Sequence, residues 1–88
     1  MIKMKADEVI KLVDELKSLL DGYRSWGPMA ADAIVALDRL SSLIADGKFS
    51  EANKIADDLV SQADFYRAFV PDLAAKTDDI QRALRSLP

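Results

Sequence analysis

The apolar residues of this chain recur mostly at intervals of three and four positions, the spacing that places side chains on one face of an α-helix. In the first segment the recurring residues are Val9, Leu12, Val13, Leu16, Leu19, Leu20 and Tyr23. Charged residues fill the positions between them, so the segment has one apolar face and one charged face. Three later segments also carry apolar residues at helical spacing. The sequence therefore predicts an all-α fold in which each helix buries its apolar face against the others.

Glycine and proline residues mark the ends of the predicted helices. We expect Gly22 to end the first helix in the left-handed conformation and Pro28 to take the first position of the second. Gly47 is expected to end the second helix, and Ser50 to be the N-cap of the third. The predicted helices span about residues 5–22, 28–46, 50–69 and 71–87.

The course of the chain after Pro71 has two alternatives. Proline disfavours helical geometry at Val70 and removes a backbone donor, so it either ends the third helix or kinks it. A kink would leave one long arm over residues 50–87, whose apolar stripe would need a second copy of the chain to cover it. A return helix would match the other helices in length, although Thr77 could act as an N-cap that divides it. We expect the return helix, and hence one domain over residues 1–88 built as an antiparallel up-down bundle of three to four helices.

The composition argues against the usual catalytic and metal-binding chemistry. The chain of 88 residues contains no cysteine and no histidine, so thiolate and imidazole ligands and the usual general base are missing. Its acidic residues often stand next to each other, and neighbouring helical side chains point about 100° apart, which prevents them from sharing a metal ion. We therefore predict no catalytic, cofactor-binding or metal-binding residue and expect a protein that is not an enzyme.

The charge pattern argues against nucleic-acid and membrane partners. The chain has 12 basic and 15 acidic side chains, and no segment is rich enough in basic residues to neutralise phosphates. Charged residues also interrupt the apolar residues of positions 1–20, which excludes a signal peptide or membrane span there. A cytoplasmic location is the resulting expectation.

Aromatic residues gather at one end of the predicted bundle. Antiparallel hairpins bring Tyr23, Trp26, Phe65, Tyr66 and Phe69 together, while Phe49 falls at the opposite end. These side chains either close the core under the loop of residues 23–27 or form a contact surface. Flanking arginines favour the second alternative, since aromatic residues and arginine are enriched in interaction hot spots. The candidate partner-binding residues are Tyr23, Arg24, Trp26, Phe65, Arg67 and Phe69.

These features predict a small protein–protein interaction module, an adaptor or inhibitor that presents a helical face. Its partner would be another protein or a second copy of itself. One alternative is a structural or assembly subunit that self-associates through its helices. A second alternative is a regulator that binds a small apolar ligand in a cavity around Ala33, Ala36, Ala56 and Ala63.

Overall fold

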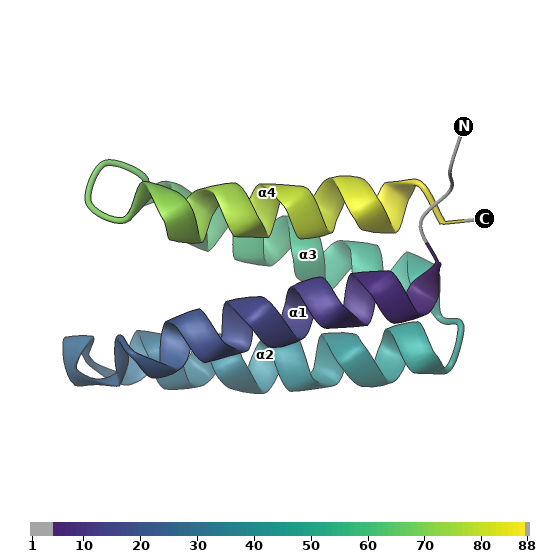
Figure 1. The fold of residues 1–88 in the computed structure, drawn as a ribbon, viewed down its shortest axis with the longest axis horizontal. Coiled ribbons are helices and arrows are strands. Elements are labelled where there is room, and N and C mark those ends of the chain that lie inside the picture. Colours follow the sequence, from purple (N-terminus) through teal and green to yellow (C-terminus); the bar gives the residue numbers. More distant parts are fainter. Residues whose placement is uncertain (1–4, 88) are drawn as a thin grey trace.

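The computed structural model describes residues 5–87, apart from the side chain of Trp26. Its elements are α1 (Ala6–Asp21), a 3₁₀ turn η1 (Arg24–Trp26), α2 (Pro28–Ala45), α3 (Phe49–Asp64) and α4 (Pro71–Arg85). Each long helix runs antiparallel to the one before it, and the described residues contain no strand (Figure 1). The predicted all-α antiparallel up-down bundle is therefore confirmed. Pro71 begins a return helix.

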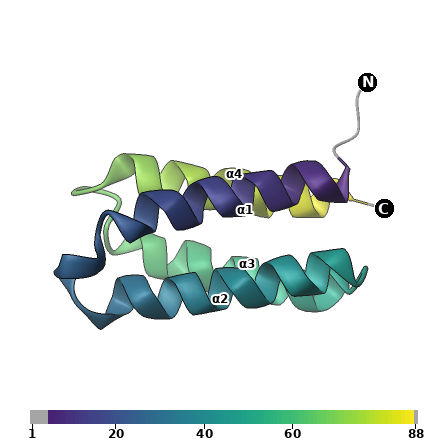
Figure 2. The same cartoon turned by 60° about the horizontal axis from the view of Figure 1, so that its bottom comes forward.

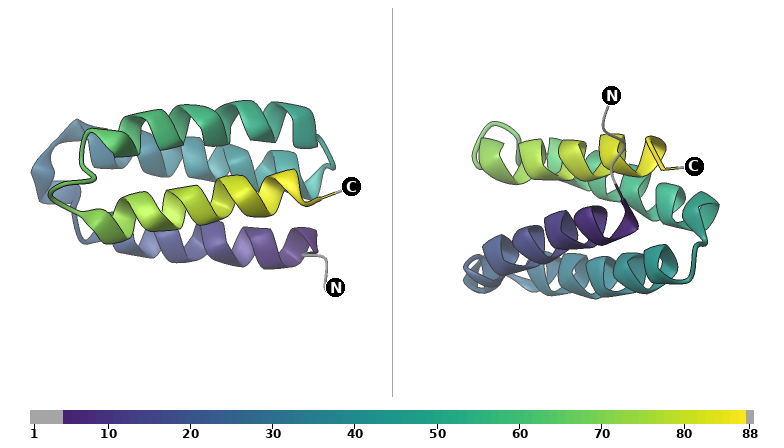
Figure 3. Two further views of the ribbon diagram at one scale, coloured as in Figure 1. Left: turned by 90° about the horizontal axis from the view of Figure 1, so that it is seen from above. Right: turned by 45° about the vertical axis from the view of Figure 1, so that its right-hand side comes forward.

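The four helices form two hairpins that pack side by side. α1 lies beside α2 and α3 beside α4, and the hairpins meet through α1 against α4 and α2 against α3 (Figure 2). The α1–α2 and α3–α4 connections lie together at one end of the bundle, which we call the loop end (Figure 3). The α2–α3 turn lies at the other end, beside the start of α1 and the end of α4.

Large aliphatic side chains from the four helices fill a single core. The largest fully buried ones include Leu16, Leu37, Leu40, Ile44, Ile80 and Leu84. Ile80 and Leu84 belong to the α4 stripe that a kinked arm would have left uncovered, and Leu73 and Leu87 of the same stripe pack against the core. The return of α4 thus buries this stripe within one chain.

The α1–α2 connection differs from the prediction at Gly22. This residue has φ −70° and continues in right-handed geometry, so the expected left-handed end at Gly22 is wrong. The chain instead passes through η1 and changes direction at Gly27, whose φ of 117° and ψ of −173° belong to a region open essentially only to glycine. Pro28 then occupies the first position of α2, as expected.

The α2–α3 turn is closed by backbone hydrogen bonds that satisfy the last carbonyls of α2. Gly47 has φ 77° and donates its N–H to the Ile44 carbonyl at 3.1 Å, while Lys48 donates to the Leu43 carbonyl at 2.9 Å. This is a Schellman ending, and it leads straight into α3 at Phe49. Ser50 therefore lies inside the first turn, and the prediction that it is the N-cap is wrong.

The third helix ends at Asp64 rather than at Phe69. Pro71 disfavours helical geometry at Val70, where φ is −135° and ψ is 72°, and the chain does not reverse there through a left-handed residue. It turns gradually over residues 65–70 instead. Thr77 does not divide α4, because its hydroxyl donates to the Leu73 carbonyl at 2.8 Å within the helix.

Candidate interaction site

The α3–α4 connection, residues 65–70, presents aromatic side chains to solvent, and we call it the aromatic loop. Phe65 is 79% exposed and Phe69 is 76% exposed. Between them Tyr66 is half-buried, and Val70 is buried against the bundle. The loop therefore anchors itself with Tyr66 and Val70 and holds the two phenylalanines outside the core.

Short backbone hydrogen bonds give the aromatic loop a defined shape. Tyr66 donates its N–H to the Ala63 carbonyl at 2.9 Å, which extends the end of α3 by a turn. The Tyr66 carbonyl then accepts from Phe69 at 2.9 Å and from Val70 at 2.7 Å. Since these bonds satisfy backbone groups that would otherwise need water, they favour one conformation of the loop.

Arg67 joins the aromatic loop to both of the helices that flank it. Its guanidinium donates to Asp64 at the end of α3, with an N–O distance of 2.7 Å, and to Asp78 in α4 at 3.0 Å. The hydrogen bond to Asp78, followed by that to Asp64, raises the pKa of Arg67. The side chain thus stays charged and uses its donors within the chain, where it braces the loop. The Asp64–Arg67 spacing of three is visible in the sequence, but the pairing with Asp78 depends on the turn at Pro71.

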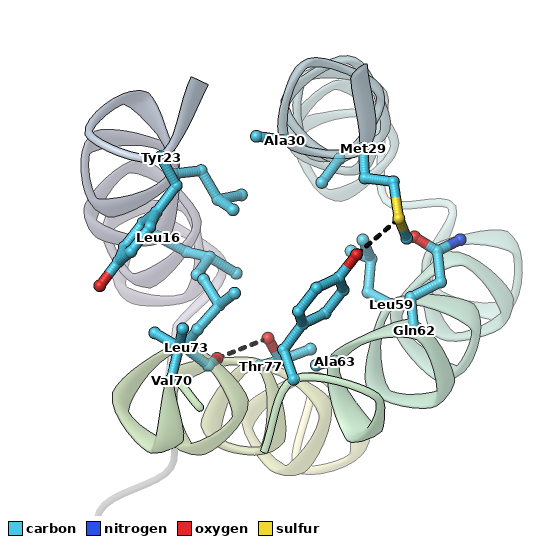
Figure 4. A pocket seen from close by; sticks show the side chains of 13 residues that line it. Leu16, Tyr23, Met29, Ala30, Leu59, Gln62, Ala63, Val70, Leu73 and Thr77 are labelled. Atoms are coloured by element: carbon cyan, nitrogen blue, oxygen red, sulfur yellow. Dashed lines mark hydrogen bonds between the residues drawn. The ribbon is translucent and has the colours of Figure 1, made fainter. Parts of the chain in front are cut away.

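Behind the aromatic loop, an apolar cavity of about 70 Å³ lies between the four helices. Figure 4 shows the side chains that line it. Tyr66 is one of them, and its hydroxyl donates to the sulfur of Met29. Ala33 and Ala63 line the cavity. The sequence also suggested Ala36 and Ala56, but Ala56 is fully packed in the core and Ala36 packs against it, so the space lies nearer the loop end.

The α1–α2 connection contributes its residues to the same end of the bundle. Tyr23 is half-buried and lines the cavity, while Arg24 is exposed and pairs with Asp21 of α1. Trp26 belongs to η1, but its side chain lies outside the described part of the structure. The candidate residues therefore divide into Tyr23, which faces the cavity, the exposed Phe65 and Phe69, and the arginines, which are paired with nearby aspartates.

The described residues offer neither a metal site nor a membrane-spanning helix. In residues 5–87, no group of three or more acidic side chains is placed so that it could hold a metal ion. Over the same range, none of the helices combines the length and the apolar character that crossing a membrane requires.

The charged residue within the aromatic loop is Arg67, and aspartates stand at positions 64, 72 and 78 of the flanking helices. Arg67 is already paired with Asp64 and Asp78, which leaves apolar area as the main feature of the loop itself. No family model, no curated protein and no solved structure matches this chain, so its function has to be argued from these residues.

Proposed function

We propose that this chain is a non-enzymatic protein–protein interaction module, an adaptor or inhibitor, and that the aromatic loop is its contact surface. The observation that carries the proposal is the exposure of Phe65 and Phe69 on one short loop. Isolated apolar side chains are common on protein surfaces, but two large aromatic rings on one loop leave considerable apolar area in water. Aromatic anchors of this kind dominate the binding energy of many interfaces.

The bracing of the loop supports the same proposal. A flexible loop loses conformational entropy when it binds, and this loss weakens the complex. Here the backbone bonds to Tyr66 and the bridge from Arg67 to Asp64 and Asp78 hold the loop before a partner arrives. The phenylalanines are thus presented in an ordered arrangement, which reduces the entropy lost on binding.

The chemistry of the loop indicates what the partner offers. Arg67 is occupied within the chain, so the free contact groups of the loop are mainly aromatic. A partner of this surface would supply an apolar pocket, and the complex should depend only weakly on salt concentration because few unpaired charges take part.

Replacement of both exposed rings tests the proposal. We expect F65A/F69A to change the free energy of unfolding by no more than about 0.5 kcal/mol, as is usual for exposed side chains. The same variant should weaken the complex with a partner identified by co-purification by about 30-fold or more, the size of a hot-spot contribution of roughly 2 kcal/mol. Isothermal titration and denaturant unfolding measure the two effects.

The matched control is V35A. Val35 is 68% exposed on α2, so this variant also removes exposed apolar area, but away from the aromatic loop. Equal loss of affinity in V35A and F65A/F69A would contradict the proposed surface. Sedimentation at several concentrations identifies a second copy as the partner if the wild type dimerises and F65A/F69A does not.

A further inference from the structure

We infer that the cavity at the loop end is a binding site for a small neutral molecule with a short alkyl group, such as an alcohol or an amide. The inference does not depend on the aromatic loop being a contact surface. It rests on the size of the cavity, the residues that line it and the side chains at its edge.

The cavity exists because small residues replace large ones at this end of the bundle. In the middle of the core, leucine and isoleucine side chains of α2 and α4 fill the interior and cover the buried alanines of α3. Toward the loop end, α2 contributes Ala30 and Ala33, and α3 contributes Ala63. The opposing Leu16 and Leu73 do not reach far enough to fill the space that these alanines leave (Figure 4).

The size and lining of the cavity select the ligand class. Its volume of about 70 Å³ is about half the roughly 150 Å³ of an apolar cavity that encloses benzene, so it can take up a short alkyl chain while the polar end of the ligand stays at its open side. No charged side chain lines it, and the hydroxyl of Thr77 is already bonded to the Leu73 carbonyl. A carboxylate or ammonium group would therefore remain unpaired there, which disfavours charged ligands.

Two polar side chains lie at the side of the cavity formed by the end of α3 and the aromatic loop. Gln62 is exposed and lines the cavity, and the hydroxyl of Tyr66 donates to the sulfur of Met29, which is a weak acceptor. The Tyr66 hydroxyl can exchange this sulfur for a ligand hydroxyl or carbonyl oxygen and gain a stronger hydrogen bond. A neutral polar group at the end of the alkyl chain would meet these two side chains.

Titration with 1-butanol tests the inference. We expect saturable changes in the methyl NMR signals of Leu20, Ala33, Ala63 and Leu73, with the signals of Ile44 at the other end unchanged. Butyrate and butylammonium should bind at least about tenfold more weakly, because each would bury an unpaired charge. Absence of saturable change with butanol would overturn the inference, and equal binding of butyrate would overturn the neutral ligand class.

A pair of substitutions on α3 separates a real cavity from a general solvent effect. A63L fills the cavity and should abolish the butanol response while keeping the melting temperature at or above that of the wild type. A56L places the same leucine in fully packed core and should lower the melting temperature, since overpacking strains a filled interior. The inference is wrong if A63L still responds to butanol, or if A63L is destabilised as strongly as A56L.

Discussion

Arg67 connects three parts of the chain, because it stands in the aromatic loop and pairs with Asp64 of α3 and Asp78 of α4. We predict that R67M, which keeps an apolar side chain but removes the guanidinium, will speed amide exchange of Phe69 and Val70 several-fold. The melting temperature should change little, because ion pairs exposed to water contribute little to stability. Hydrogen exchange followed by NMR measures the effect.

R82M is the control for this substitution. Arg82 is also exposed and also pairs with an aspartate, but Asp79 lies in the same helix, so this pair joins no separate elements. Its loss should leave the exchange of the aromatic loop unchanged. Similar exchange in R67M and R82M would show that the bridge from Arg67 does not order the loop.

At the scale of elements, the α1–α2 connection contains two glycines with different conformations. Gly27 has φ 117°, which strains any other residue, although a Cβ there would meet no atom within 4 Å. We predict that G27A lowers the free energy of unfolding by about 1–3 kcal/mol through this backbone strain alone. G22A should be neutral or raise it by up to about 1 kcal/mol, because Gly22 is right-handed and alanine restricts the unfolded chain. Urea unfolding compares the two, and equal losses would contradict the assignment of strain to Gly27.

The elements also show how far the sequence could predict this fold. Helical spacing and the positions of Pro28, Gly47 and Pro71 predicted an antiparallel bundle of three to four helices with a return helix after Pro71, and the structure has four. The end of α3 was predicted too late in the sequence, because Tyr66 and Val70 continue the apolar spacing of the helix. Both side chains do face the bundle, but the backbone at these residues is no longer helical. The spacing of apolar residues indicates which side chains face the core, and a turn can keep side chains facing the core just as a helix does.

The candidate site was predictable to a similar degree. The antiparallel order correctly placed both connections, and the aromatic residues that they carry, at one end of the bundle. The partners of Arg67 and the contact of Tyr66 with Met29 could not be predicted, because they depend on the path of the aromatic loop and on the distance between hairpins.

At the scale of the whole molecule, the two hairpins are held together by one core that neither could form alone. Residues from α1 and α2 meet residues from α3 and α4 in the same buried cluster, and the Cα radius of gyration of 12.3 Å agrees with about 12 Å expected for a compact chain of this length. A small chain with a single core should unfold in one step.

Because the four helices share one core, a cavity created in either hairpin should destabilise the whole bundle. Leu37 in α2 and Ile80 in α4 are 0% and 1% exposed, and truncation of such side chains to alanine costs about 2–5 kcal/mol. We therefore expect each of the variants L37A and I80A to lower the unfolding midpoint of the whole bundle. Within one variant, the NMR signals of α1 and those of α4 should report the same midpoint. The loss would be a large share of a total stability on the order of 5–15 kcal/mol. If α1 and α4 unfold at different midpoints in I80A, the first hairpin keeps its structure after the second has unfolded. That result would contradict a shared core, because it requires an independent core in each hairpin.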